Sequence, residues 1–323
     1  MTDRYARQMT LSAIGPEGQA RLGRAHVLVV GAGGLGSHVL LALAGAGIGR
    51  LTIVDHDRVE ITNLHRQPLY RMGDIGRPKA EAARDALALY NPEVSVTARS
   101  ERLRPGNAAP LVASADIVVD AADSLAVTYI LSDACRAATK PFVTASVLEQ
   151  RGYAGAFCGG APSYRAVFPD MPSTVGSCAA NGVLGSAVGV IGSLEAHLAL
   201  GIALGASPSP LGRLISIDLA TFKLGGFRFD GTPEPAGNAI AFIEPSDVTP
   251  DDVVVELRDD AEAPEPALPQ AVRLDPASVA EGFTPPAGRR VVFCCRSGIR
   301  AHRAARLLER REARPLAVIA AGP

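Results

Sequence analysis

The stretch HVLVVGAGGLGSHVLLALAGAGIGRLTIVDHD, residues 26–57, constrains the fold of this chain more than any other segment. An apolar run is followed by spaced glycines, a helix-like apolar stretch, a second apolar run and two aspartates. This order predicts a strand, a tight turn, a helix and a second strand, the unit that holds the phosphates of a nucleotide. It leaves open which nucleotide is bound and what is done with it.

The glycines form a G-x-G-x-x-G motif from Gly31, Gly33 and Gly36, with Gly34 inside it. The first glycine allows a tight turn, the second lets a phosphate approach the backbone, and the third lets the helix pack on the strand. The amino end of the helix then offers unpaired N–H groups to an anion. These residues are therefore predicted to bind the nucleotide.

Two cations that follow the motif favour ATP over NAD. Asp55 ends the second strand, where an acid accepts hydrogen bonds from ribose hydroxyls, and Asp57 is expected to join the same site. Arg66 lies on the next loop, and Lys79 follows Pro78 in the first turn of a predicted helix, where a cation opposes the helix dipole. ATP split between its α- and β-phosphates needs such cations, because charge builds on the departing pyrophosphate. A solvated surface charge is the alternative for either cation taken alone.

Asp123 is a candidate magnesium ligand. It lies in DIVVDAADS, just beyond the carboxyl end of a predicted strand, which is the edge that holds the ligand in an open α/β sheet. Mg²⁺ is usually bound through one or two carboxylates and phosphate oxygens. A helix N-cap at Asp123 or Ser124 is the alternative.

Alternating strand-like and helix-like segments predict an α/β fold with a doubly wound, mostly parallel Rossmann-like sheet. The predicted strands lie near 26–30, 51–54, 94–98, 116–120 and 141–147, then at 151–158, 164–168, 213–219 and 222–229, the last two as a hairpin. The predicted helices lie near 34–47, 78–90, 124–138 and within 182–205. The last is interrupted by Glu195 and His197, which favours a buried helix over a membrane span. We expect a nucleotide-binding domain at 1–230, a Pro-rich linker at 231–250 and a short domain at 251–323.

Composition argues against several other classes of protein. The net charge is −1 and only 5% of residues are aromatic, so nucleic acid is an unexpected partner. The first residues, MTDRYARQMT, lack the layout of a secretion signal, and the five cysteines are irregularly spaced, which indicates a cytoplasmic protein with free thiols. Since the chain has no C-x-x-C and no H-x-x-x-H pattern, no zinc is predicted.

On these motifs the sequence resembles the MoeB/ThiF family (HesA/MoeB/ThiF), relatives of ubiquitin-activating enzymes. The resemblance spans roughly residues 4–229 through RYARQ, VLVVGAGGLGS, LTIVDHDRVEITNLHRQ, IGRPKAEAARDAL, NPEV, DIVVDAADS and VGVIGSLEA. It implies a homodimer that binds ATP and Mg²⁺ and adenylates the carboxyl-terminal glycine of a ubiquitin-like sulfur carrier protein ending in Gly-Gly. Thiamin, molybdopterin and other thiolated products remain open as the pathway served.

The resemblance also implies roles for single residues. Arg7 would reach into the partner subunit's site, with a plain surface arginine as the alternative. Cys178 matches the cysteine that bonds to the activated carrier, with a buried core thiol as the alternative. At the nucleotide the family implies Asp55 at the ribose, Asn63, Arg66 and Lys79 at the phosphates, and Asp123 by Mg²⁺.

The sequence departs from the family pattern in two places. Many members bind zinc through two C-x-x-C pairs, whereas the place of the first pair here is PSYRAV, with Ser163 and Ala166, and the second pair is absent. We therefore expect no zinc. Ser124 also replaces the asparagine that usually follows the metal-side aspartate.

The short terminal domain resembles a rhodanese. Its CRSGIR loop, residues 295–300, lies between a predicted strand and helix, so N–H groups and arginines favour a thiolate or persulfide on Cys295. Sulfur from a donor such as a cysteine desulfurase would pass through Cys295 to the adenylated carrier, while Cys294 points into the core. An inactive rhodanese fold remains open.

Three rival functions also remain open. A family member of this kind could adenylate a different carboxylate, such as that of a modified tRNA nucleoside or a peptide. An NAD-dependent oxidoreductase is disfavoured by Arg66, Lys79 and the lack of a catalytic His or Tyr constellation. The third is a non-catalytic protein that only docks the carrier.

Overall fold

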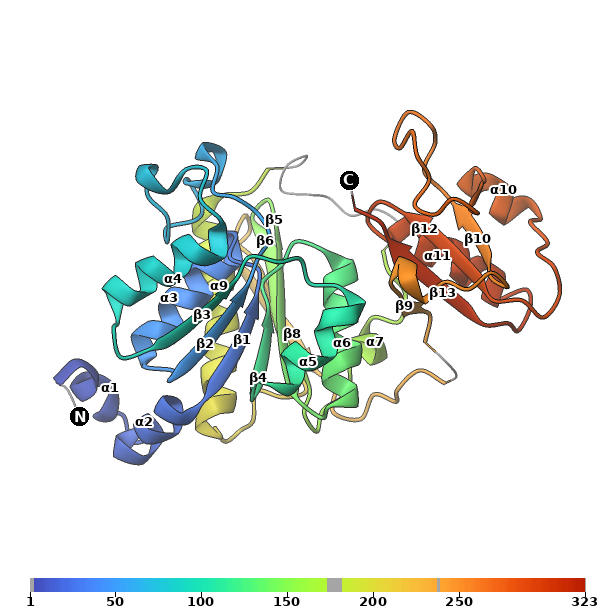
Figure 1. The fold of residues 1–323 in the computed structure, drawn as a ribbon. Helices are drawn as coiled ribbons and strands as arrows, with labels where there is room; N and C mark the ends of the chain where they lie inside the picture. Colours follow the sequence, from blue (N-terminus) through green and yellow to red (C-terminus); the bar gives the residue numbers. More distant parts are fainter. Residues whose placement is uncertain (1–2, 173–181, 237–238, 323) are drawn as a thin grey trace.

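The computed structural model describes residues 3–172, 182–236 and 239–322 of the chain. The predicted carrier-linked cysteine, Cys178, lies outside the described residues. The described residues form two α/β lobes, a large lobe up to residue 236 and a small lobe from residue 239 (Figure 1).

The large lobe is built on an eight-stranded sheet in the order β3-β2-β1-β4-β5-β6-β7-β8. Its parallel part comprises β1 (His26–Val30), β2 (Arg50–Val54), β3 (Ser95–Arg99), β4 (Ile117–Asp120) and β5 (Pro141–Leu148). Its antiparallel part adds β6 (Arg151–Cys158), β7 (Arg213–Asp218) and β8 (Lys223–Arg228). The chain winds outward from β1 to β3 and then returns to β4. The doubly wound sheet and the terminal β7–β8 hairpin predicted from the sequence are therefore confirmed.

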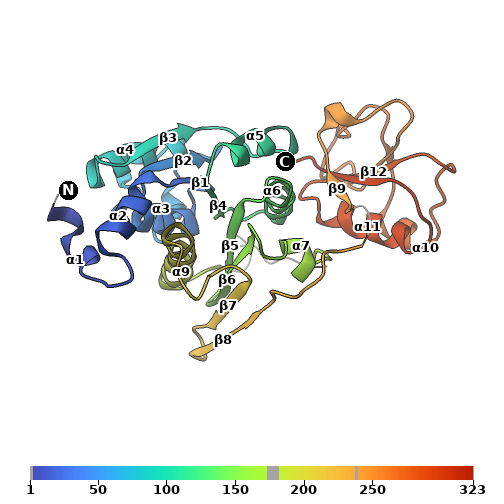
Figure 2. The same ribbon diagram turned by 90° about the horizontal axis from the view of Figure 1, so that it is seen from below.

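Helices cover both faces of this sheet, because buried parallel strands need a layer on each side (Figure 2). On one face lie α3 (Gly34–Ala46), α4 (Lys79–Tyr90) and α9 (Gly185–Leu204), and on the other α5 (Pro105–Ala113) and α6 (Leu125–Ala137). Among the described residues, α9 alone is long and apolar enough to cross a membrane, yet it packs along α3, β5 and β6. Near the amino ends of the strands lie α1 (Ala6–Met9) and α2 (Gly15–Arg24) (Figure 1).

One strand prediction is wrong. Residues 164–168 were expected as a strand, but α7 (Tyr164–Val167) is a short helix. Ser163 caps it, because its Oγ accepts a hydrogen bond from the Ala166 N–H at 3.2 Å. Tyr164 and Arg165 are both buried, which the two-residue alternation of a half-buried strand does not allow.

The small lobe has an all-parallel sheet in the order β11-β10-β12-β13-β9. Its strands are β9 (Ala241–Phe242), β10 (Val253–Glu256), β11 (Val272–Arg273), β12 (Val291–Cys295) and β13 (Leu316–Ala320), with helices α10 (Pro276–Glu281) and α11 (Ile299–Glu309). The edge strand β9 lies inside the 231–250 segment predicted as a linker and pairs with β13. One hydrophobic cluster runs from Tyr129 and Phe157 in the large lobe to Phe293 and Leu308 in the small lobe.

The core of the large lobe contains one unpaired acid, Glu195 on α9. The residue is fully buried, and neither carboxylate oxygen has a hydrogen-bond partner among the described residues. Burial, with a smaller contribution from Asp120, raises the pKa of Glu195 well above its ordinary value. The folded state therefore holds this proton more tightly than the unfolded chain, and Glu195 lowers stability increasingly as the pH rises above the ordinary carboxyl pKa.

We expect Glu195→Gln to raise the melting temperature, and to raise it more at pH 8 than at pH 5. The gain at pH 8 should be on the order of 1–3 kcal/mol, because the native glutamine does not need to hold a proton that the unfolded glutamate releases, and each unit of raised pKa is worth about 1.4 kcal/mol. Thermal unfolding at the two pH values measures it, with Glu281→Gln, at an exposed site, as the control. If the gain in melting temperature were the same at pH 5 and pH 8, the raised pKa of the buried Glu195 carboxyl group would be contradicted.

Candidate functional site

The glycine turn lies at the carboxyl edge of the large sheet, between β1 and α3 (Figure 1). Gly31 has a φ of +95°, and a Cβ added to it would lie 2.6 Å from the Ala121 carbonyl oxygen after β4. A Cβ on Gly36 would overlap the Gly31 carbonyl oxygen. Only glycine fits either position, and Gly33 caps α3 without any side-chain hydrogen bond. The first N–H groups of α3 therefore remain available to an anion.

Asp55 follows β2 and holds the glycine turn in place. Its Oδ2 accepts a hydrogen bond from the Ala32 N–H at 2.7 Å, and its Oδ1 accepts one from the Asp57 N–H at 2.8 Å. Burial raises the pKa of Asp55 above its ordinary value, although these N–H donors and Lys79 act against the shift. The structure thus places Asp55 beside the turn, as predicted, and shows that its carboxylate also braces the loop.

Lys79 begins α4 and is already paired with a carboxylate of its own chain. The side chain is buried, its Nζ donates to Asp57 Oδ2 at 2.9 Å, and its backbone N–H donates to the Asp57 carbonyl oxygen at 2.8 Å. Burial of Asp57 disfavours the carboxylate, but the hydrogen bond and charge of Lys79 outweigh it, so the pKa of Asp57 lies below its ordinary value. In the structure without a ligand, the negative charge of Asp57 therefore compensates the positive charge of Lys79, which opposes the helix dipole.

Arg66 lies next to the amino end of α3. A Cβ on Gly34 would lie 3.8 Å from Arg66 Cδ, so the stem of the arginine crosses the glycine turn. Its Nη1 donates to the Thr62 carbonyl oxygen at 3.0 Å and lies 2.7 Å from His65 Nε2. Asn63, at the end of the 3-10 helix Ile61–Asn63, is buried, and its carbonyl oxygen accepts the Arg66 N–H at 3.1 Å. Asn63 thus shapes the loop that aims Arg66.

Sequence reasoning missed two residues of this site, Gln67 and Tyr70. Gln67 is 3% exposed, its Nε2 faces Gly33, and its Oε1 has no partner among the described residues. The Tyr70 hydroxyl donates to the Ala32 carbonyl oxygen at 2.7 Å and lies 3.2 Å from that of Lys79. The sequence signal for these two residues was their presence as hydrogen-bonding side chains within four positions of Arg66 in HRQPLY. The sequence does not show that both are buried, because their burial depends on the tertiary fold.

Asp123 is exposed beyond the end of β4. Of the two residues considered as a helix cap, Ser124 is the N-cap residue of α6, without a side-chain cap hydrogen bond, and Asp123 precedes it. Since β1 pairs with both β2 and β4, Asp123 follows the strand on one side of the glycine turn and Asp55 follows the strand on the other. Asp123 therefore lies at the same edge of the sheet, and no hydrogen bond or ion pair joins its carboxylate to another described residue.

Arg7 lies far from this edge within its own chain. It is exposed on α1, and Tyr5, two residues before it, packs against Gly47, which follows the carboxyl end of α3. The glycine turn is at the other end of α3, about 20 Å away for a helix of 13 residues. Arg7 is therefore not brought to the site of its own subunit.

Ser163 and Ala166, at the place of the family's first C-x-x-C pair, take part in a hydrogen-bonded cluster around Glu234, called the clasp below. Ser163 Oγ donates to Glu234 Oε2 at 2.6 Å, and the Ser163 N–H donates to Glu234 Oε1 at 2.8 Å. Arg136 lies 3.4 Å from the same carboxylate. Glu234 thus ties α7 to the segment that follows β8, and Ala166 contributes only its backbone N–H to the cap.

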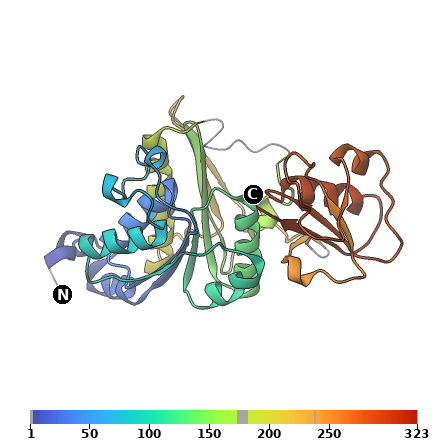
Figure 3. The same cartoon turned by 45° about the horizontal axis from the view of Figure 1, so that its top comes forward.

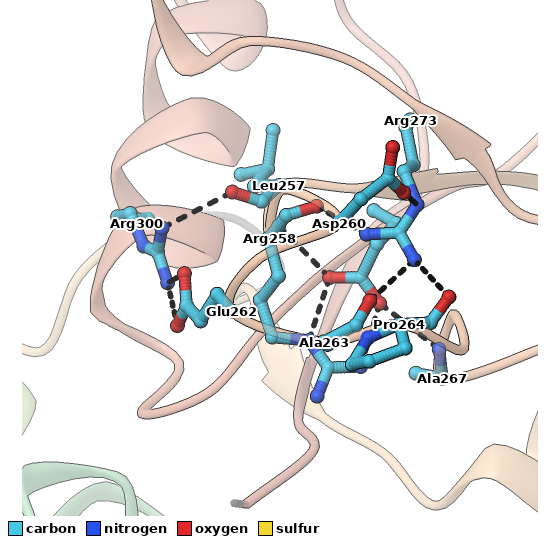
Figure 4. Close-up of polar contacts among 10 residues, drawn as sticks. Leu257, Arg258, Asp260, Glu262, Ala263, Pro264, Ala267, Arg273 and Arg300 are labelled. Carbon is cyan, nitrogen blue, oxygen red and sulfur yellow. Dashed lines mark hydrogen bonds and ion pairs between the residues drawn. The ribbon is translucent and has the colours of Figure 1, made fainter.

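Cys295 ends β12 in the strand, turn and helix that the sequence predicts. It is fully buried, and its Sγ accepts a hydrogen bond from the Ala301 N–H at 3.3 Å. Arg300 donates to Glu262 Oε2 at 2.7 Å and to the Leu257 carbonyl oxygen at 3.2 Å, so it holds the loop after β10 beside the cysteine (Figure 4). Cys294 packs in a different hydrophobic cluster, where burial raises its pKa to about 12.

Comparisons with known proteins identify the family of the chain. The ThiF family model matches residues 5–236. The chain is 46% identical over 218 residues to the adenylyltransferase and sulfurtransferase MOCS3 of Aedes aegypti, covering 67% of this chain and 50% of that protein. It is 44% identical over 224 residues to the sulfur carrier protein adenylyltransferase of Thermus thermophilus, covering 67% of this chain and 83% of that protein. The chain spans about half the length of the MOCS3 relatives it matches.

Solved structures share the fold of the large lobe. A crystal structure of E. coli MccB with ATP superposes with a TM-score of 0.61 at 24% identity, over 72% of this chain and 72% of that one. At 24% sequence identity, this structural similarity shows a shared fold and nothing about function. On the family match and the identity to its relatives, the chain belongs to the ThiF family.

Proposed function

We propose that this protein is an ATP-dependent adenylyltransferase that activates the carboxyl-terminal glycine of a small ubiquitin-like sulfur carrier protein. The observation that carries the proposal is the pair of cations at the glycine turn. Arg66 crosses the turn itself, and Lys79 is linked to it through Asp57 and Asp55. A compact dinucleotide pyrophosphate needs only the turn, whereas a triphosphate split at its inner linkage also needs cations around the leaving group.

In the proposed reaction the glycine carboxylate attacks the α-phosphorus of ATP in line. A P–O bond forms to the carboxylate, the bond to the bridging oxygen breaks, and pyrophosphate leaves. A carboxylate is already ionised at neutral pH, so no general base is required, and positioning and charge neutralisation supply the catalysis. Lys79 and Arg66 would exchange Asp57 and the Thr62 carbonyl for phosphate oxygens, while Asn63 holds the loop and Asp55 meets the ribose.

Asp123 fits a role beside Mg²⁺. Its carboxylate is exposed at the same edge as the turn, and hard oxygen donors are the ligands that Mg²⁺ prefers. The ion would neutralise phosphate charge there. Ser124 in place of asparagine leaves this carboxylate unchanged.

The antiparallel strands offer a surface for the carrier. An open cavity of about 650 Å³ lies over β5, β6, β7 and β8, with Tyr153, Phe168, Leu224 and Phe227 in its lining. Leu224 and Phe227 are 77% and 50% exposed. An apolar face of this kind, rimmed by charges such as Arg151 and Lys223, is typical of a protein-binding site. The extended Gly-Gly tail of a bound carrier would run from this surface toward the carboxyl edge, where β5 ends at Leu148 in the lining of the cavity.

We further propose that two copies of the chain form the working enzyme. Arg7 is separated from its own glycine turn by the length of α3, so a role of Arg7 at a triphosphate would require a neighbouring copy. We also place the protein in the cytoplasm, where its cysteines stay reduced and a cysteine desulfurase can supply sulfur.

Cys295 would carry the sulfur. Its persulfide attacks the carbonyl carbon of the acyl-adenylate, a C–S bond forms, and AMP leaves with the carboxylate oxygen. A dithiol reductant then splits the S–S bond, which releases the carrier thiocarboxylate and leaves the Cys295 thiol. The Ala301 N–H donates to Cys295 Sγ and Arg300 lies beside it, so both are placed to stabilise negative charge that develops on the sulfur in this step. For Cys178 we propose only the role that the family resemblance implies, a covalent bond to the activated carrier.

The decisive experiment incubates the protein with ATP, Mg²⁺ and each small Gly-Gly-ended protein of the same cell. Carrier-dependent exchange of labelled pyrophosphate into ATP supports the proposal. Addition of a persulfide donor and dithiol should then give a carrier whose mass has changed by replacement of oxygen by sulfur. A lack of exchange with every such protein would leave only a docking role.

Lys79→Ala should slow pyrophosphate exchange by about 100-fold, because one preorganised donor to the leaving phosphates is lost. The carrier should bind as before, since Lys79 does not line its surface. Lys140→Ala, at the opposite edge of the sheet, is the matched control. Exchange that stays near the wild-type rate in Lys79→Ala would contradict the phosphate role.

Cys295→Ala should leave pyrophosphate exchange unchanged and abolish thiocarboxylate formation with a persulfide donor, because only the sulfur carrier atom is removed. Cys294→Ala should preserve both activities. Intact-mass spectrometry of the carrier measures the product. Undiminished thiolation in Cys295→Ala would show that the small lobe is an inactive rhodanese fold.

A further inference from the structure

The small lobe is docked against the large lobe through α11, the helix that begins in the Cys295 loop. Arg306, near the end of α11, donates from Nη2 to the Pro169 carbonyl oxygen at 2.8 Å, and its Nε lies 2.9 Å from Asp170 Oδ1. Arg310 approaches the same carboxylate at 3.7 Å. Glu309 holds the Arg306 guanidinium from the other side at 2.6 Å. One acid of the large lobe thus meets two arginines of the small lobe.

A buried layer lies behind this ion pair. The His302 ring of α11 lies 5.9 Å from the Tyr129 ring of α6, and the Tyr129 hydroxyl donates to the Phe168 carbonyl oxygen at 2.7 Å. Arg165, only 2% exposed, lies 4.7 Å over the Tyr129 ring and donates to the Ile240 carbonyl oxygen at 3.2 Å, just before β9. The lobes therefore pack as a continuous core and not as tethered bodies.

The docked orientation turns the Cys295 loop toward the nucleotide edge. The Gly322 N–H donates to the Arg296 carbonyl oxygen at 3.0 Å, and the guanidinium of Arg102, from the loop after β3, occupies the space that a Gly322 side chain would fill. Arg102 in turn lies 3.4 Å from His56, the residue between Asp55 and Asp57. The end of β13 accordingly returns to the large lobe between the two sheets (Figure 3).

We propose that Arg306 and Asp170 form a latch that fixes the orientation of the small lobe, so that the loop after Cys295 is held toward the carboxyl edge where the acyl-adenylate forms. Both are positioning residues for sulfur transfer, since neither touches ATP or the reacting sulfur. The inference rests on the proposed function. The side chains of Arg306 and Asp170 are 22% and 53% exposed, and solvent-accessible ion pairs contribute little to overall stability, so the latch specifies the orientation of lobes that the apolar core already joins.

Charge reversal tests the latch. Arg306→Glu places a carboxylate against Asp170 and the Pro169 carbonyl, and should slow thiocarboxylate formation with persulfide donor and dithiol at least about tenfold, because a displacement of about 1 Å is enough to cost that much. Pyrophosphate exchange should stay within about twofold of wild type, since the nucleotide edge is intact. Adding Asp170→Arg to Arg306→Glu restores an ion pair of opposite polarity and should recover most of the thiolation rate. Arg303→Glu, at an exposed site on the same helix, is the matched control.

Small-angle X-ray scattering supplies a readout that does not need the reaction. Arg306→Glu should increase the radius of gyration and the double variant should return it to the wild-type value. Unchanged thiolation and scattering in Arg306→Glu would overturn the latch, as would a parallel loss of exchange or a double variant no better than the single one. Failure of the proposed function itself would appear as absent exchange in the wild-type protein, and the scattering comparison would still decide the latch.

Discussion

The close fit between the glycine turn and the backbone after β4 is the constraint on which the rest of this structure depends. Gly31 lies so near the Ala121 carbonyl oxygen that no side chain fits between them, and Gly36 packs directly on Gly31. This fit brings the amino end of α3 to the carboxyl edge of the sheet, with Asp55 bracing it from β2. Because the turn is held there, the first N–H groups of α3 lie at the same edge of the sheet as Arg66 and Lys79.

The structure without a ligand shows how a buried cation is tolerated at this edge of the sheet. Lys79 is almost fully buried at the amino end of a helix, where the helix dipole opposes a positive charge. Asp57 supplies the compensating charge at 2.9 Å and is itself half-exposed, so it would stay solvated if Lys79 turned to a phosphate as proposed. The same principle operates in the small lobe, where Glu262 holds Arg300 beside Cys295.

Local patterns carried most of what the sequence could predict. Strand and helix periods, the glycine spacing and the acids at strand ends are short-range signals, so they predicted the doubly wound sheet, the position of Asp55 after β2 and the strand, turn and helix around Cys295. The YRAVF segment was misread because its two buried neighbours and its Ser163 cap depend on a clasp with the distant Glu234. Tyr70, Gln67 and the Lys79–Asp57 pair were missed for the same reason, since each contact joins segments that only the fold brings together.

The central claim is that this edge of the sheet is shaped to hold a triphosphate and release its outer two phosphates. A crystal structure with Mg²⁺ and a non-cleavable ATP analogue tests it most directly. The account predicts the phosphates over the first N–H groups of α3, with Lys79 and Arg66 moved from Asp57 and Thr62 onto the outer two. Phosphates bound elsewhere, or an edge that leaves Lys79 on Asp57 and Arg66 on Thr62, would contradict it.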